Sequence, residues 1–178
     1  MTVPEAKLRD TDGGKVPGSE GWFVVNLADA AGARTPDLGA YMPFESPENV
    51  FTQFGINIHV LKPGEPSGMY HAEGAQEAFL VLHGECLLVV EEEERTLQQW
   101  DFFHCPPSVE HIMVGAGEGP CAVLMIGRRG ADYGIHYPVS EAAGRHGASV
   151  PAATDDPNRA YEHVARELTP ERLGWPPS

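Results

Sequence analysis

Short apolar runs separated by turn-forming residues fill the middle of the chain, from about residue 22 to residue 137. In one run Ile56, Ile58 and Val60 alternate with Asn57 and His59, which is the period of a strand with two different faces. The runs predict strands at Trp22–Leu27, Val50–Leu61, Gly68–Glu73, Glu77–Leu82, Cys86–Glu91, Arg95–Leu97, Asp101–Cys105, His111–Val114 and Cys121–Ile126. Because the turns between them are rich in Gly and Pro, the pattern is typical of an antiparallel sandwich or barrel. We therefore predict an all-β fold.

The two ends of the chain lack this pattern. Residues 1–21 are polar and Gly-rich, and we expect a flexible N-terminal segment there. Residues 138–178 are rich in Pro, Ala and Arg and predict a C-terminal extension with short helices. The expected organisation is thus one β-barrel over residues 22–137 between these two segments.

Two short helices are expected in the extension. Ser140 is a suitable N-cap for a helix over Glu141–Arg145. Asp156 and Pro157 form a second helix start, followed by a helical body over Arg159–Glu167. The second helix has a narrow apolar stripe, which we expect to pack on the β core or on a partner subunit.

Composition narrows the classes of partner. The chain has 178 residues, with 12 Lys and Arg against 26 Asp and Glu, and a formal net charge of −14. This charge disfavours nucleic acid and anionic membrane surfaces as partners. No apolar run approaches the length of a membrane span and the N-terminus is too polar for a signal peptide, so we expect a cytoplasmic protein. Cys86, Cys105 and Cys121 have no Cys-x-x-Cys spacing, and we expect reduced, buried thiols.

Two histidines and two glutamates form the candidate site. His71 and Glu73 lie two residues apart on a predicted strand, so their side chains point to the same face. A turn at 74–76 would place Glu77 on the neighbouring strand, where cross-strand side chains lie ~5 Å apart. His111 follows on a distant strand. Imidazole and carboxylate groups together suit a first-row divalent metal, and the sequence therefore predicts a metal site.

These residues resemble the first of two motifs of the cupin superfamily. That motif reads Gly, His-x-His, Glu and Gly in order, and this sequence has Gly64, His71-x-Glu73, Glu77 and Gly84 at matching spacing. The resemblance implies a double-stranded β-helix, or jelly-roll barrel, with a metal held by His and Glu side chains.

The second cupin motif is also present, with departures. The family pattern is Pro-x-Gly-x-x-His followed by Asn, and here Pro106-x-Ser108-x-x-His111 is followed by Gly115. His71, Glu77 and His111 match ligand positions directly, which implies a divalent transition metal such as Fe, Mn, Ni or Zn.

Glu73 stands where the cupin pattern has a second His, and this leaves its role open. Glu73 either binds the metal directly or acts through a bound water or substrate, leaving two His and one carboxylate as ligands. Metal-free cupin barrels are the other possibility. Without a cation, however, two neighbouring carboxylates in an apolar barrel would be costly.

Two kinds of function follow from the resemblance. One is a metal-dependent enzyme such as a dioxygenase, with Glu73 as a catalytic base; the other is a non-catalytic barrel that binds or senses a small ligand. Between Pro63 and Gly127 the only Lys or Arg is Arg95, which favours a small neutral or aromatic molecule over a sugar phosphate and makes an isomerase less favoured. We expect the pocket to be lined by Met69, Phe79, Phe103, Met113 and Met125. By analogy with cupins of this size, we also expect a homodimer, with Trp22–Leu27 as a pairing strand.

Overall fold

Antiparallel strands dominate the computed structural model, which describes residues 2–130 and 133–178. The strands are β1 (Leu8–Thr11), β2 (Gly14–Pro17), β3 (Gly32–Thr35), β4 (Gly39–Met42), β5 (Phe54–Leu61), β6 (Ala72–Glu73), β7 (Glu77–His83), β8 (Glu85–Val90), β9 (Glu93–Gln98), β10 (Phe102–Cys105), β11 (His111–Ala116), β12 (Cys121–Arg128), β13 (Ile135–His136) and β14 (Thr169–Glu171). Two one-turn helices, α1 (Glu141–Gly144) and α2 (Pro157–Ala160), lie in the C-terminal part.

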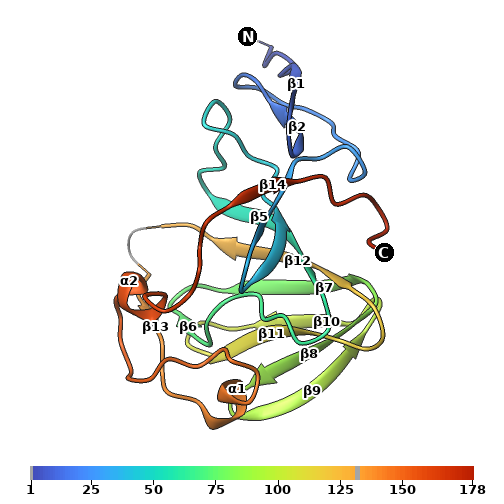
Figure 1. The fold of residues 1–178 in the computed structure, drawn as a ribbon. Helices are drawn as coiled ribbons and strands as arrows, with labels where there is room; N and C mark the ends of the chain where they lie inside the picture. The colour runs from blue at the N-terminus through green and yellow to red at the C-terminus, as the bar shows by residue number, and fades with distance from the viewer. Residues whose placement is uncertain (1, 131–132) are drawn as a thin grey trace.

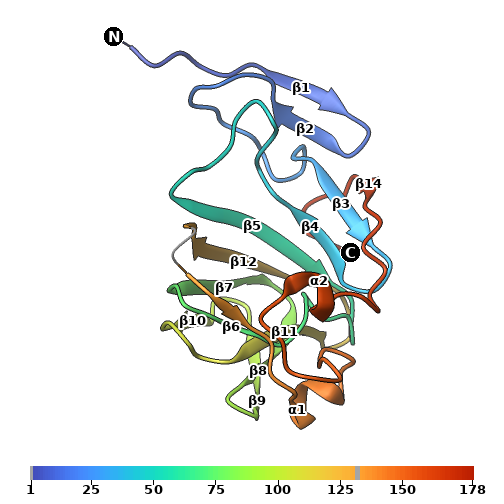
Figure 2. The ribbon, with the colours of Figure 1, turned by 90° about the vertical axis from the view of Figure 1, so that its left-hand side faces the viewer.

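Two sheets enclose the main core. One has the strand order β10-β7-β12-β5-β4-β3-β14, and the other has the order β11-β8-β9. Figure 2 shows β5, β12, β7 and β10 on one side of the barrel and β8, β9 and β11 on the other. Alternate residues point inward, so that Phe79, Val81 and Val123 of the first sheet pack with Leu88 and Met113 of the second. The all-β, jelly-roll prediction is confirmed.

The N-terminal part differs from the expectation. Trp22–Leu27 is not a strand, because Trp22 makes only an isolated bridge with Glu5. The paired strands lie earlier, in the hairpin β1–β2, where Asp12 and Gly13 form the two-residue loop. Asp-Gly is a strong signal for a tight hairpin, and it was available in the sequence. Figure 1 shows this hairpin projecting from the barrel at the N-terminal end.

The C-terminal extension wraps back onto the barrel. Helix α1 begins after Ser140, whose side chain accepts a hydrogen bond from the Ala143 N–H, as predicted. Helix α2 has the predicted cap at Asp156 but ends at Ala160, and the prediction of a helix to Glu167 is wrong. The strand β14 then pairs with β3, which joins the last part of the chain to the larger sheet.

The acidic segment Glu91–Glu94 lies at the end of the β8–β9 hairpin, with Glu91 and Glu92 in the loop, and it also contacts the C-terminal extension. A Glu92 carboxylate oxygen accepts a hydrogen bond from the Ala142 N–H at 3.1 Å, and Glu94 lies 2.8 Å from the Arg145 guanidinium. A carboxylate at the start of a helix satisfies N–H groups that have no partner within the helix. These acidic side chains therefore dock α1 as well as facing solvent.

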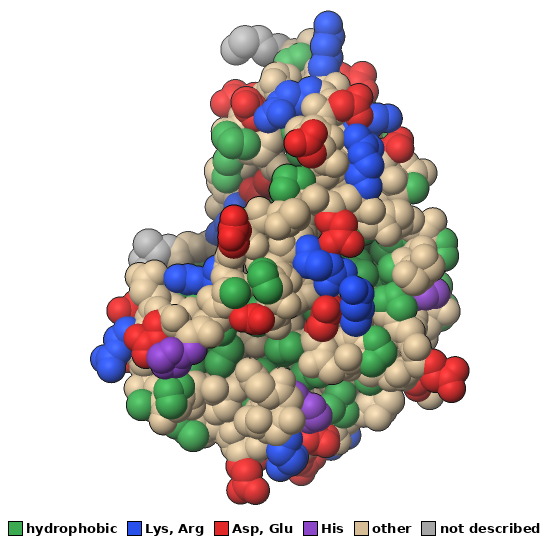
Figure 3. Space-filling model, in the orientation of Figure 1, with side chains coloured by type: hydrophobic (Ala, Val, Ile, Leu, Met, Phe, Trp, Pro, Cys, Tyr) green, Lys and Arg blue, Asp and Glu red, His purple; other side chains and the backbone are tan. Residues whose placement is uncertain are grey.

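The three cysteines are free and buried. On the face shown in Figure 3, acidic and basic side chains are interspersed and form no large patch of one sign. No helix among the described residues is long and apolar enough to cross a membrane.

Candidate metal centre

His71 and His111 lie directly opposite each other on neighbouring backbone segments. The His71 N–H donates to the His111 carbonyl at 3.2 Å, and the His111 N–H donates to the His71 carbonyl at 2.8 Å. Opposed residues of an antiparallel pair point to the same face, so the two rings lie together, with centroids 4.9 Å apart. The backbone alone thus places the two imidazoles side by side.

Each imidazole is held by its Nδ1 atom. Nδ1 of His71 lies 2.7 Å from the Met69 carbonyl oxygen, and Nδ1 of His111 lies 3.0 Å from the Val109 carbonyl oxygen. A carbonyl oxygen only accepts hydrogen bonds, so both rings carry their proton on Nδ1 when neutral. Burial lowers the pKa of His71, and it lowers the pKa of His111 to about 4. Both rings are therefore neutral at pH 7, with a free lone pair on Nε2 as a metal requires.

Glu77 reaches this pair from the opposite sheet. We expected a turn that pairs the strand of Glu73 with the strand of Glu77, but β6 pairs with β13, whereas β7 pairs with β10 and β12. Residues 74–76 instead cross from one sheet to the other, with the Gln76 carbonyl accepting from the Arg128 N–H at 3.4 Å. The convergence is across the barrel interior, because His111 and Glu77 lie on strands of different sheets.

The Glu77 carboxyl group is buried without a hydrogen-bond partner on one oxygen. Its Oε2 atom lies 3.3 Å from Nε2 of His111, and among the described residues no group forms a hydrogen bond with it. Burial, and secondarily the charge of Glu73, raise the pKa of Glu77 to about 8. An unpaired buried carboxyl group facing a neutral imidazole is unfavourable on its own and is a suitable ligand for a cation.

Glu73 lies at the edge of this group. Its Oε1 atom is 4.0 Å from Nε2 of His71, and its side chain is about one-third exposed, at 31 %. The group with metal-ligand geometry consists of His71, Glu77 and His111, whose ligand atoms lie within 4.8 Å of one another. Two neutral imidazoles and one carboxylate fit a first-row divalent ion, and Glu73 is close enough to act beside it.

Two tyrosines, Tyr137 just before the C-terminal extension and Tyr161 within it, support His71, and sequence patterns gave no indication of this. The Met69 N–H donates to the Tyr161 hydroxyl at 3.1 Å, while the Met69 carbonyl accepts from His71. The ring of Tyr137 lies 5.8 Å from the His71 ring and packs edge-on against Tyr161. We expected the apolar stripe of the second helix, to which Tyr161 belongs, to pack on the β core or on a partner subunit. Its contact with the residue that holds His71 connects the extension to the site.

Two further polar residues face the barrel interior. Asn57 is paired across the sheet with Met125, and His59 with Val123, so both point to the face that carries the core. Asn57 Oδ1 and His59 Nδ1 are buried and have no hydrogen-bond partner among the described residues. Burial lowers the pKa of His59 to about 4. The alternation along this strand indicated the shared face but not that it points inward.

Two clefts adjoin the site. One, of about 800 Å³, is lined by Glu77 together with residues of β5, β12 and the segment after β12; the other, of about 520 Å³, includes Glu73. The residues that we expected to line a pocket are mainly core residues. Phe79 and Met113 are buried, Phe103 and Met125 pack against them, and Met69 packs with Tyr137.

A comparison with known protein families assigns this part of the chain. Residues 57–127 match the model of the cupin domain, and this range includes all four candidate site residues. The chain contains a cupin domain. No curated protein sequence matches the chain.

Solved cupin structures have the same fold. A sugar phosphate isomerase of the cupin superfamily from Silicibacter pomeroyi is 20% identical, with a TM-score of 0.53 over 64% of this chain and 80% of the other. The polyketide cyclase from Streptomyces resistomycificus is 15% identical, with a TM-score of 0.51 over 59% and 78%. At these identities the likeness establishes the fold alone.

A third structure, from Acidithiobacillus ferrooxidans, is 28% identical, with a TM-score of 0.46 over 48% of this chain. The match spans 56% of that protein's length.

Proposed function

We propose that this protein is a metal-dependent cupin enzyme that acts on a small molecule, with the metal held by His71, Glu77 and His111. The observation that carries the proposal is the buried, unpartnered Oε2 atom of Glu77, which faces the Nε2 atom of His111. Burying a neutral polar group without a hydrogen-bond partner costs on the order of 2–7 kcal/mol. A divalent cation would compensate for this cost.

The protein side chains around the site have distinct tasks. The Met69 and Val109 carbonyl groups fix the two imidazole rings, so that their Nε2 atoms point at the same space. Glu73, partly exposed and near His71, is the proposed catalytic base that holds or moves a substrate proton. A divalent metal bound here would supply Lewis acidity and, in the case of iron, redox chemistry.

Among reaction classes, we propose a dioxygenase as the first to test. Two histidines and one carboxylate are the ligand set of many non-haem iron oxygenases. Phe79 and Phe103 lie beside His111, with ring centroids 5.1 and 6.0 Å from its ring, and they would favour an apolar or aromatic substrate body. A barrel that only binds a small ligand is the alternative.

Metal analysis tests the proposal directly. Untagged protein should contain about one transition-metal ion per chain, and His71→Ala or His111→Ala should lose it. His104→Ala is the matched control, because His104 is exposed on β10. A chain that contains no metal after growth in metal-supplemented medium, and whose melting temperature does not respond to Fe, Mn, Ni or Zn, would contradict the metal site.

A turnover assay distinguishes the proposed enzyme from the alternative, a barrel that only binds a ligand. Oxygen consumption by iron-loaded protein should be measured with catechol-like, enediol and flavonoid compounds, alongside Glu73→Gln. Loss of activity in this variant, with metal content retained, would support a catalytic role for Glu73. Saturable ligand binding without consumption of any substrate would instead support the binding protein.

Oligomeric state and location stay predictions. We propose a homodimer, although Trp22–Leu27 is not a strand and therefore does not provide the pairing edge. Light scattering distinguishes the monomer from the dimer.

A further inference from the structure

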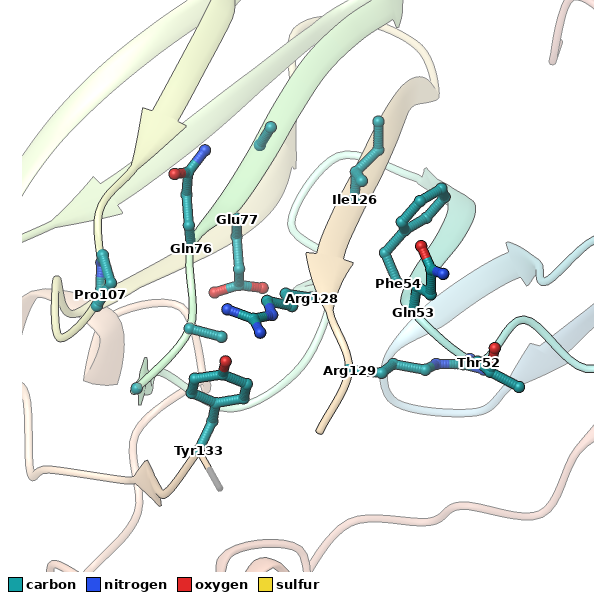
Figure 4. A pocket seen from close by; sticks show the side chains of 13 residues that line it. Thr52, Gln53, Phe54, Gln76, Glu77, Pro107, Ile126, Arg128, Arg129 and Tyr133 are labelled. Atoms are coloured by element: carbon teal, nitrogen blue, oxygen red, sulfur yellow. The ribbon is translucent and has the colours of Figure 1, made fainter. Parts of the chain in front are cut away.

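The cleft beside Glu77 contains two arginines, Arg128 at the end of β12 and Arg129 directly after it. Arg128 and Arg129 line it together with Tyr133, and its volume is about 800 Å³. In Figure 4 the Glu77 carboxyl group and the Arg128 guanidinium group point into the same space, with the Tyr133 ring beside them. A cationic side chain therefore shares a cleft with a candidate metal ligand.

The two arginines differ in how their charge is compensated. Arg129 forms two hydrogen bonds with the Glu45 carboxylate, at 2.7 and 2.5 Å, and a third with the Phe51 carbonyl. Arg128 has no carboxylate partner among the described residues, and its guanidinium carbon lies 4.8 Å from the centre of the Tyr133 ring. Stacking on an aromatic face orients a guanidinium group but leaves its N–H donors available in the plane. Arg129 is thus held by the fold, whereas Arg128 is oriented toward the cleft.

The second cleft at the site has the opposite character. Glu73, Glu110 and Asp155 line it, and Asp155 pairs with His136. A hydrogen bond from the Gly74 N–H to the Gly134 carbonyl, 2.8 Å long, joins the two backbone segments that line both clefts. On a chain with a net charge of −14, a negatively charged molecule would be repelled from the acidic cleft and attracted to the one with Arg128.

We propose that Arg128 binds the carboxylate group of a small, planar organic acid whose other end reaches the site at Glu77. This inference rests on the proposed function and names its substrate class. The Arg128 guanidinium group offers two parallel N–H donors, which match the two oxygens of one carboxylate. Ile126, Phe54 and Pro107 line the same cleft and provide apolar surface for the body of the acid.

An organic acid differs from the small neutral or aromatic molecule that the sequence favoured, in that it carries a negative charge. That expectation rested on the scarcity of cations between Pro63 and Gly127, and Arg128 is the next residue in the chain. A carboxylate is preferred over a phosphate because, within the described part of the chain, only one of the two guanidinium groups in the cleft lacks a carboxylate partner, and a phosphate dianion usually requires more positive charge.

Matched acid and amide pairs test the proposal. Benzoate and benzamide, and then cinnamate and cinnamamide, should be titrated by calorimetry into metal-loaded wild-type protein, Arg128→Gln and Arg95→Gln. Arg95 is the matched control, because it is exposed at the β8–β9 hairpin and pairs with Glu93. We expect at least one acid to bind about tenfold or more tightly than its amide, and Arg128→Gln to abolish the difference while Arg95→Gln retains it.

Each contrary result overturns the inference. These results are equal binding of acid and amide, no saturable binding of either acid at millimolar concentration, an unchanged preference in Arg128→Gln, or equally strong competition by inorganic phosphate. Metal content is measured in the same samples, so that failure of the metal site is recognised separately. Arg128-dependent binding of the acid by protein that takes up no metal would contradict the proposed function and leave the anion site supported.

Discussion

The metal-free protein should lose stability as the pH rises from 6.5 to 8, and Glu77 should be responsible. Burial and the charge of Glu73 raise the pKa of Glu77 from its ordinary value of 4.5 to about 8 in the folded protein. Between these values the unfolded chain has released the proton and the folded chain still binds it. Unfolding therefore becomes more favourable with increasing pH, and the stability present below pH 4.5 is lost as the pH rises toward 8.

The magnitude follows from the width of the pH window. Each pH unit contributes 1.36 kcal/mol for one proton, so the interval from 6.5 to 8 lowers the free energy of unfolding by about 2 kcal/mol. The Glu77 side chain is only 13 % exposed, so solvent screening reduces this value little. For a chain of this length the loss corresponds to about 4–8 °C in melting temperature.

We take pH 6.5 as the lower limit because, below this pH, the titration of buried histidines changes the free energy of unfolding in the opposite direction. Burial lowers the folded-state pKa of His59 and His111 to about 4, so the unfolded chain binds their protons first as the pH falls. Their contribution to stability is present above pH 6.5 and is lost as the pH falls toward 4. Metal-free protein should therefore be most stable near pH 6.5.

Thermal unfolding of chelator-treated protein at several pH values checks this reasoning. Glu77→Gln removes the titrating group and should abolish the decrease between pH 6.5 and 8, whereas Glu118→Gln, at an exposed turn, should retain it. Metal-loaded protein should not show this decrease, because Glu77 is then deprotonated in the folded protein as it already is in the unfolded chain at these pH values. A flat wild-type profile in this window, or an identical decrease in Glu77→Gln, would refute the raised pKa.

Three further predictions concern parts of the chain that support the site. Tyr161→Phe removes the hydroxyl that accepts from the residue holding His71 and should weaken metal binding about tenfold or more without unfolding the protein, as measured by metal titration. Ser140→Ala removes the N-cap of α1 and should cost about 1 kcal/mol in denaturant unfolding; no change would mean that the cap contributes nothing. Gly115→Ala places a Cβ atom against the Lys62 carbonyl oxygen and should destabilise the fold by about 1–3 kcal/mol in denaturant unfolding, whereas normal stability would show that the backbone shifts freely there.

The sequence was informative about the site because ligand spacing is a local property. The alternation of β-strands indicated that His71 and Glu73 share a face, and the two motifs identified Glu77 and His111. The prediction that the strand of Glu77 pairs with the strand of Glu73 was wrong, because pairing between non-neighbouring segments is not encoded in local periodicity.

Other misses have similar causes. Trp22–Leu27 has the composition of a strand but pairs through only one bridge, between Trp22 and Glu5, and Leu27 packs against the core residues of β4, β5 and β12. The second helix ends early at Ala160, where Tyr161 turns toward Met69 and Tyr137. In both places tertiary contacts overrode a local preference, as they usually do for short elements.

The sequence by itself determined the all-β class, the cupin motifs and the donor set of the candidate metal site, because alternation and spacing are readable within one segment. Only the tertiary structure decided which residues surround that donor set. It brought Glu77 across the barrel, connected Tyr161 to the backbone that holds His71, and placed Arg128 in the cleft beside Glu77. Contacts between segments far apart in the chain arise from the packing of the two sheets and the return of the C-terminal extension, and no local pattern specifies them.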